Sequence, residues 1–161
     1  LEIVKHGNPG RIINVASTAH KNTQLDFEDI QGINDYKGWP AYGRSKLMNI
    51  MFTYECHRRF GDSRVTFNCL HPGFVNSNFE NINSGITRSS INLAKSVFAI
   101  NVMRGAKTSV FLASTDEVEN ISGKYFDKCK AKKSSKVSYI EKDQKQLWET
   151  TEDMIKSIQT N

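Results

Sequence analysis

The chain has 161 residues, of which 38% are hydrophobic and 24% are charged, a composition typical of one packed domain. No run approaches the roughly 18 apolar residues that a membrane-spanning helix needs, and no secretory leader pattern opens the chain. The net charge of +5 resides between Lys128 and Lys136, where five lysines occur without an acid. We interpret this segment as a solvated surface turn. It contains no aromatic residue on which a nucleic-acid base could stack, so we expect no nucleic-acid partner.

The hydrophobic pattern predicts strands that alternate with helices. Short apolar runs predict buried parallel strands at Ile12–Val15 and Val65–Leu70, with a short final strand at Lys124–Phe126. Helical patterns cover residues 40–60, 102–114 and 141–158. In the first of these helices Pro40 suits the first turn, and Gly61 stands where a C-cap glycine is expected. A strand, a crossover helix and a second strand form a βαβ unit, which is right-handed and parallel.

Two side chains in the first of these helices indicate chemistry. Tyr42 and Lys46 are four residues apart, so they share one helix face. A lysine charge beside a phenol favours the phenolate, which brings the tyrosine closer to acid–base work at ordinary pH. Upstream, the apolar run 12–15 leads into Ser17, and the carboxyl ends of parallel strands are where open α/β sheets bind ligands.

The order of these features resembles that of the short-chain dehydrogenase/reductase superfamily, and within it the retinol dehydrogenase group. The resemblance is carried by Arg11–His20, Ala41–Asn49, Leu70–Gly73 and Gly123–Asp127. It implies the C-terminal portion of a doubly wound, parallel-sheet (Rossmann-type) α/β domain. We therefore expect residues 1–161 to form one partial dinucleotide-binding and catalytic domain without its N-terminal half, with a substrate lid at 78–100 and a terminal helix at 141–158.

The resemblance also implies roles for single residues. Tyr42 would be the general acid and base, Ser17 would donate a hydrogen bond to the substrate oxygen, and Lys46 would assist Tyr42 and hold the nicotinamide ribose. The segment after the second strand would pass close to the cofactor, through Pro72, Gly73, Val75 and Ser77. His20, three residues after Ser17, would border the substrate pocket. The implied reaction interconverts an alcohol and a carbonyl on a lipophilic, retinoid-like substrate, with hydride transfer to or from NADP or NAD.

The family's Gly-rich phosphate turn is absent from these 161 residues, and the chain begins with Leu1 rather than methionine. We therefore expect the chain to be part of a longer protein and to be inactive alone. In a complete domain of this kind, residues after the second strand of the N-terminal half decide between NAD and NADP. The resemblance favours NADP only slightly. A membrane anchor is not visible in this part, and a homodimer is compatible with the resemblance.

Other functions and sites were weighed from the same residues. One alternative is a non-catalytic binding or regulatory module that keeps the fold, and another is a surface binder that uses the lysine-rich segment. The presence of Ser17, Tyr42 and Lys46 favours the enzyme. The four histidines fit no zinc-ligand spacing, so no metal site is predicted. The odd number of cysteines indicates reduced thiols in an intracellular compartment, either the cytoplasm or a membrane surface.

Overall fold

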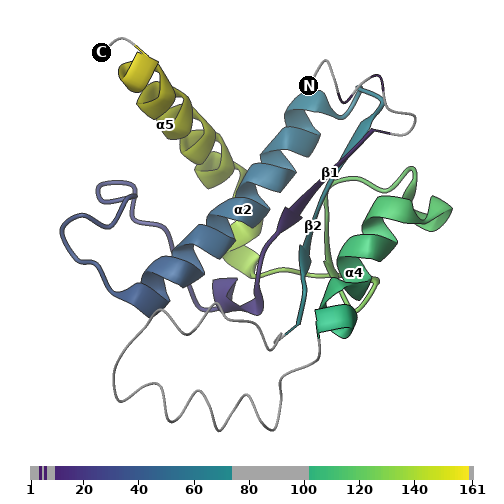
Figure 1. The fold of residues 1–161 in the computed structure, drawn as a ribbon. Coiled ribbons are helices and arrows are strands. Elements are labelled where there is room, and N and C mark those ends of the chain that lie inside the picture. Colours follow the sequence, from purple (N-terminus) through teal and green to yellow (C-terminus); the bar gives the residue numbers. More distant parts are fainter. Residues whose placement is uncertain (1–3, 5, 7–9, 74–101, 160–161) are drawn as a thin grey trace, which may run out of the picture.

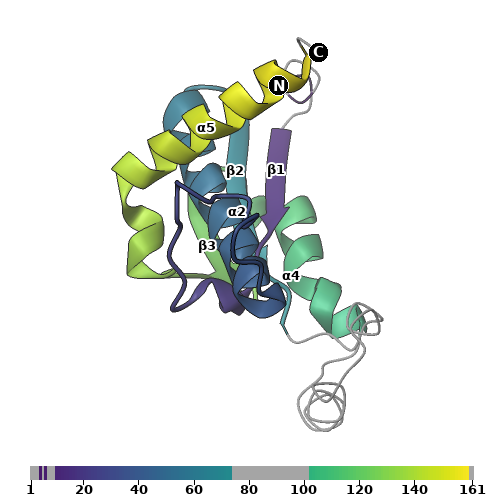
Figure 2. The ribbon, with the colours of Figure 1, turned by 90° about the vertical axis from the view of Figure 1, so that its left-hand side faces the viewer.

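The computed structural model describes Val4, His6, residues 10–73 and residues 102–159. These residues form one sheet whose strands follow the order β1-β2-β3-β4. Figure 1 labels β1 and β2, and Figure 2 labels β3 as well. The strands are β1 (Gly10–Val15), β2 (Val65–His71), β3 (Lys124–Asp127) and β4 (Lys130–Lys132). The first three strands pair in parallel, and β4 pairs antiparallel to β3. The predicted class, a portion of a parallel-sheet α/β domain, is confirmed.

Helices cover both faces of the sheet. The described α-helices of more than one turn are α2 (Gly38–Phe60), α4 (Val102–Ser114) and α5 (Glu141–Gln159), and the short 3-10 helices are η1 (Thr18–His20), η3 (Asp116–Val118) and η4 (Lys136–Tyr139). Figures 1 and 2 show α2 and α4 on opposite faces of the sheet, with α5 crossing the outer side of α2. None of the helices within the described ranges is long and apolar enough to cross a membrane.

Side-chain alternation along β2 explains why this strand has apolar residues on both of its faces. Cys69 packs with Ile50 and Tyr54 of α2, whereas its neighbour Leu70 packs with Leu112 of α4. Successive side chains of a strand point to opposite faces, so a strand covered on both sides carries apolar residues at successive positions. This arrangement accounts for the continuous apolar runs in the sequence.

The ends of α2 differ in detail from the expectation. The helix begins at Gly38 rather than at Pro40, and Pro40 lies within the first turn, where the missing N–H of proline is tolerated. Gly61 is the C-cap, but its φ of −61° is right-handed. A Cβ at Gly61 would stand 2.6 Å from the carbonyl oxygen of His57, so the position needs glycine for space rather than for a left-handed backbone.

The prediction that the strand at 124–126 is the last one was wrong. The chain turns back through Lys128 and Cys129 into β4, which pairs Lys130 with Asp127 and places part of the lysine-rich segment on the edge of the sheet. The two turn residues have φ values of 51° and 60°, as a two-residue type I′ hairpin requires. Such turns normally carry Asn-Gly or similar pairs, so the Lys-Cys pair gave no signal. The predicted lid at 78–100 lies outside the described residues.

Candidate active site

The backbone carbonyl group of Val15, at the carboxyl end of β1, is hydrogen-bonded to two side chains of α2. The oxygen of Val15 accepts hydrogen bonds from Lys46 Nζ at 3.3 Å and from Asn49 Nδ2 at 3.1 Å. Residues three apart lie on the same face of a helix, so this face of α2 is directed toward the end of β1. The carboxyl ends of strands are where open α/β sheets bind ligands.

Tyr42 lies on the same helix face as Lys46. The ammonium nitrogen of Lys46 is 5.5 Å from the centroid of the Tyr42 ring. The ring also packs at a tilt against Trp39, with centroids 5.7 Å apart. Both Tyr42 and Lys46 are partly exposed, so solvent or a ligand can reach them. The phenol and the ammonium therefore stand together beside the end of β1.

Ser17 follows that strand end by two residues and caps η1. Its backbone is extended, with φ −156° and ψ 157°, and its hydroxyl oxygen accepts a hydrogen bond from the Ala19 N–H at 3.2 Å. The side chain is largely buried, with the residue 8% exposed. Because the oxygen acts as an acceptor toward Ala19, the hydroxyl proton is left for donation to another group.

Gly43 brings the turn that carries Ser17 against the helix that carries Tyr42. A Cβ at Gly43 would stand 2.8 Å from Thr23 Oγ1 and 2.9 Å from the carbonyl oxygen of Ala19. No side chain larger than hydrogen fits at those distances, so the contact depends on glycine. A role for Gly43 was not predicted from the sequence. The available signal was a glycine inside a helical pattern, which often marks a close backbone approach.

His20 does not border a pocket, contrary to the expectation. It is fully buried, with Nδ1 2.5 Å from the carbonyl oxygen of Ser17 and Nε2 accepting from the Ser135 N–H at 3.1 Å. Burial lowers the pKa of His20 below its usual value of 6.5. The expectation failed because the partner, Ser135, is 115 residues away in the sequence.

His71 and the residues after it stand beside the same turn. Its Nδ1 accepts the N–H of Thr18 at 3.4 Å, and burial lowers the pKa of His71. Pro72 and Gly73 follow β2, and the φ of 91° at Gly73 is a conformation that favours glycine. Val75 and Ser77, the other two predicted cofactor contacts, lie outside the described residues.

The side chains present fit a nicotinamide cofactor at this place. A ribose presents hydroxyl groups, and Lys46 has three N–H donors, of which the Val15 carbonyl takes one. The glycine at 73 leaves room for a close approach of the backbone. In contrast, no group of three His, Cys, Asp or Glu side chains in the described part of the chain is arranged to hold a metal ion.

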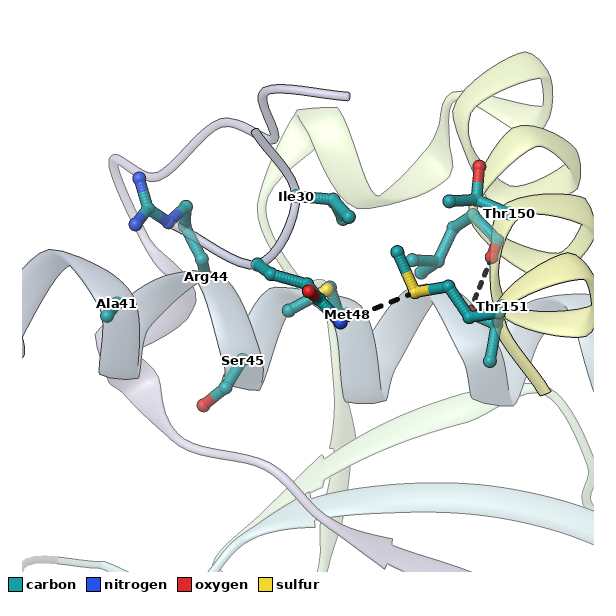
Figure 3. Close-up of a pocket in the computed structure, with 10 residues that line it drawn as sticks. Ile30, Ala41, Arg44, Ser45, Met48, Thr150 and Thr151 are labelled. Atoms are coloured by element: carbon teal, nitrogen blue, oxygen red, sulfur yellow. Dashed lines mark hydrogen bonds between the residues drawn. The ribbon is translucent and has the colours of Figure 1, made fainter. Parts of the chain in front are cut away.

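Two hollows lie elsewhere, along the contact between α2 and α5. One has a volume of about 380 Å³, and Figure 3 shows Ile30 of the connection and Thr151 of α5 on either side of Met48. The other, of about 410 Å³, is lined by side chains that include Phe52 and Trp148. Ser17, Tyr42 and Lys46 line neither. The hollows are therefore separate from the candidate site.

Comparison with known proteins identifies relatives over nearly the whole chain. The chain is 36% identical over 157 residues to retinol dehydrogenase 14 of Homo sapiens, and the match covers 96% of this chain and 47% of that protein. It is 37% identical over 153 residues to retinol dehydrogenase 12 of Mus musculus, covering 92% and 46%. With the WW domain-containing oxidoreductase of Homo sapiens it shares 34% identity over 164 residues, covering 96% and 39%. The chain thus spans about half the length, or less, of these curated relatives.

Solved structures show the same fold. An uncharacterised protein from Mycobacterium paratuberculosis superposes with a TM-score of 0.66 at 24% identity, over 91% of this chain and 50% of that one. A short-chain type dehydrogenase/reductase from Mycobacterium ulcerans gives a TM-score of 0.52 at 20% identity, over 76% and 41%. No protein-family model matches the sequence.

The relatives define the class of protein: the chain belongs to the short-chain dehydrogenase/reductase superfamily. The superfamily resemblance seen in the sequence is thereby confirmed. Within the superfamily, the chain is a member of the retinol dehydrogenase-like group, since its similarity to those proteins extends over 96% of its residues.

Proposed function

We propose that the whole protein is an NAD(P)-dependent oxidoreductase that interconverts an alcohol and a carbonyl, and that this chain supplies its proton-transfer groups. The observation that carries the proposal is the position of Lys46, 3.3 Å from the Val15 carbonyl and 5.5 Å from the Tyr42 ring. This position brings Tyr42 and Lys46 to the strand end that leads into Ser17. The names of the relatives, retinol dehydrogenases and an oxidoreductase, support the same reaction class.

Each side chain then has a distinct role. In the oxidation direction the Tyr42 oxygen accepts the proton of the substrate hydroxyl, and in the reduction direction it returns that proton. The Ser17 hydroxyl donates a hydrogen bond to the same substrate oxygen and stabilises the charge that develops there. Lys46 holds its positive charge beside the Tyr42 phenol and binds ribose hydroxyls, while Pro72, Gly73, Val75 and Ser77 contact the cofactor. The nicotinamide, when bound, supplies or accepts the hydride.

A lipophilic substrate of the retinoid kind is the second part of the proposal. The segment that leads into Tyr42 exposes three large apolar side chains: Ile33 at 77%, Tyr36 at 73% and Trp39 at 72%. Trp39 touches the Tyr42 ring directly. Apolar side chains exposed beside a reactive group provide the contact surface that an apolar substrate needs.

Substitution of Tyr42 in the whole protein tests the proposal. Tyr42→Phe removes the hydroxyl and keeps the ring, so kcat should fall by about 10²–10⁴-fold, the usual contribution of a general acid–base group. Tyr125→Phe, which removes a buried hydroxyl that has no hydrogen-bond partner among the described residues, is the matched control and should retain kcat. If Tyr42→Phe stayed within about tenfold of the parent, a barrier change of only ~1.4 kcal/mol, Tyr42 would not be the acid–base group.

A further inference from the structure

His20 occupies a position that the proposed chemistry does not explain. Its ring is fully buried, and each of its two nitrogens has a partner: the Ser17 carbonyl at Nδ1 and the Ser135 N–H at Nε2. A backbone N–H can only donate, so Nε2 must carry a lone pair. The single proton of the neutral ring is then on Nδ1, where it is donated to the Ser17 oxygen.

The ring is also held from its side. It packs edge-on against Tyr125 of β3, with centroids 5.2 Å apart and planes at 63°. Tyr125 belongs to the core cluster that α2 covers. The imidazole therefore cannot turn without disturbing the sheet, and its two hydrogen bonds have a fixed direction.

Ser135, which donates to His20 Nε2, belongs to a turn at residues 134–139 that is itself held by hydrogen bonds. Ser134 Oγ lies 2.7 Å from the Tyr54 hydroxyl of α2 and 2.6 Å from Ser138 Oγ. The carbonyl of Ser138 accepts from Gln144 Nε2 of α5 at 2.8 Å. This turn, residues 134–139, is thus tied to both α2 and α5, and it offers His20 a fixed point of attachment.

We propose that His20, as the neutral Nδ1–H tautomer, is a positioning residue that fixes Ser17 by joining its carbonyl group to the turn 134–139. The inference depends on the role of Ser17 in the proposed function. Ser17 follows a strand end and caps a helix of only three residues. The His20 bridge orients the peptide from which the Ser17 hydroxyl projects toward the substrate oxygen.

Two variants separate the two halves of the bridge. His20→Asn keeps a donor near the Nδ1 position and loses the contact to Ser135, whereas His20→Gln keeps an acceptor near the Nε2 position and loses the donor to Ser17. In the whole protein we expect His20→Gln to lower kcat at least tenfold with KM little changed, and His20→Asn to retain more of the parent kcat. His6→Gln, at an exposed histidine, is the control.

The assays are run below the unfolding temperature of each variant, so that a merely structural effect does not appear as lost kcat. If Ser17→Ala lowers kcat and both His20 variants leave it unchanged, the positioning role is wrong although the proposed function stands. If Ser17→Ala itself leaves kcat unchanged, the proposed function is what fails.

A spectroscopic test on the present chain needs no turnover. Long-range ¹H–¹⁵N correlation spectra of the imidazole should report the Nδ1–H tautomer for His20 at pH 7, and His6 supplies the reference signal of an exposed ring. Hydrogen exchange at the Ser135 amide should quicken at least tenfold in His20→Leu and less in His20→Gln. An Nε2–H tautomer, or unchanged exchange at Ser135 in His20→Leu, overturns the proposal.

Discussion

Gly43 of α2 and Ala19 of η1 approach so closely that a Cβ on the glycine would stand 2.9 Å from the alanine carbonyl oxygen. This contact sets the spacing between the turn that carries Ser17 and the helix that carries Tyr42. Its consequence can be measured by comparison with a second glycine of α2, Gly38. Apart from its own helix backbone and chain neighbours, no atom of the described residues lies within 4 Å of the Cβ position of Gly38.

Alanine at these two positions should therefore have opposite effects. Glycine to alanine inside a helix normally stabilises by up to about 1 kcal/mol, and Gly38→Ala should raise the urea midpoint or leave it unchanged. Gly43→Ala should lower the free energy of unfolding by about 1–3 kcal/mol, as overpacking does. Equal midpoints for the two variants would show that the close approach of α2 and η1 is not tight.

Acidification should destabilise the fold through His20 and His71. Burial holds the pKa of each below the ordinary value of 6.5, so between the folded and unfolded pKa values the unfolded chain binds more protons. The stability that the neutral rings contribute is fully present above pH 6.5 and is lost as the pH falls through the folded values. Urea unfolding at pH 7.5, 6.5, 5.5 and 5.0 should show this decline.

The slope of the free energy of unfolding against pH is limited by the number of protons that the two histidines take up on unfolding. Each histidine contributes at most about 1.4 kcal/mol per pH unit. The double variant His20→Gln/His71→Gln, compared over the same pH values, should show a flatter dependence although it is less stable at pH 7.5. A slope identical to that of the parent would assign the acid sensitivity to other groups.

The three free cysteines should differ sharply in reactivity. Burial raises the pKa of Cys56 and of Cys69 to about 12, and both side chains are buried, whereas Cys129 is partly exposed. The thiolate is the nucleophile, so only Cys129 should react quickly with a disulfide reagent at pH 8. Titration should give one fast thiol in the native chain and three in denaturant, and Cys129→Ser should remove the fast phase. Two fast thiols in the native chain would contradict this burial.

The present chain should bind neither NADH nor NADPH saturably. None of its ten glycines forms the Gly-rich turn that binds the pyrophosphate at a helix N-terminus in this superfamily. The proposed cofactor contacts of this chain, which are Lys46, Pro72, Gly73, Val75 and Ser77, do not include such a turn. Calorimetry at micromolar protein should give no saturation, and a clean micromolar dissociation constant would show that a pyrophosphate site exists here without that turn.

Features that depend on local pattern could be predicted from the sequence. The first three strands could be predicted because each contains a short apolar run, and in β2 the buried residues Val65, Phe67, Cys69 and Leu70 provide it. The helix α2 was recognised because Pro40 marks its first turn and its apolar positions recur at helical spacing. The common face of Tyr42 and Lys46 follows directly from that spacing.

Features that depend on long-range contacts could not be predicted. The burial of His20 requires Ser135 from the other end of the chain, and no periodicity relates the two residues. The turn at Lys128 and Cys129 adopts positive φ values without glycine or asparagine, since the pairing of β3 with β4 imposes them. The space requirement at Gly43 comes from Ala19, which only the folded connection brings there.

The carbonyl group of Val15 also limits how the sheet can grow. The Ala16 N–H is bonded to Leu70 of β2 at 2.7 Å, and backbone groups alternate in direction along a strand, so the Val15 carbonyl points to the other edge of β1. There Lys46 and Asn49 occupy both of its lone pairs. A strand that paired with β1 along that edge could not hydrogen-bond to the Val15 carbonyl. It would have to separate from β1 at Val15, which would leave a gap between the two strands beside Ser17.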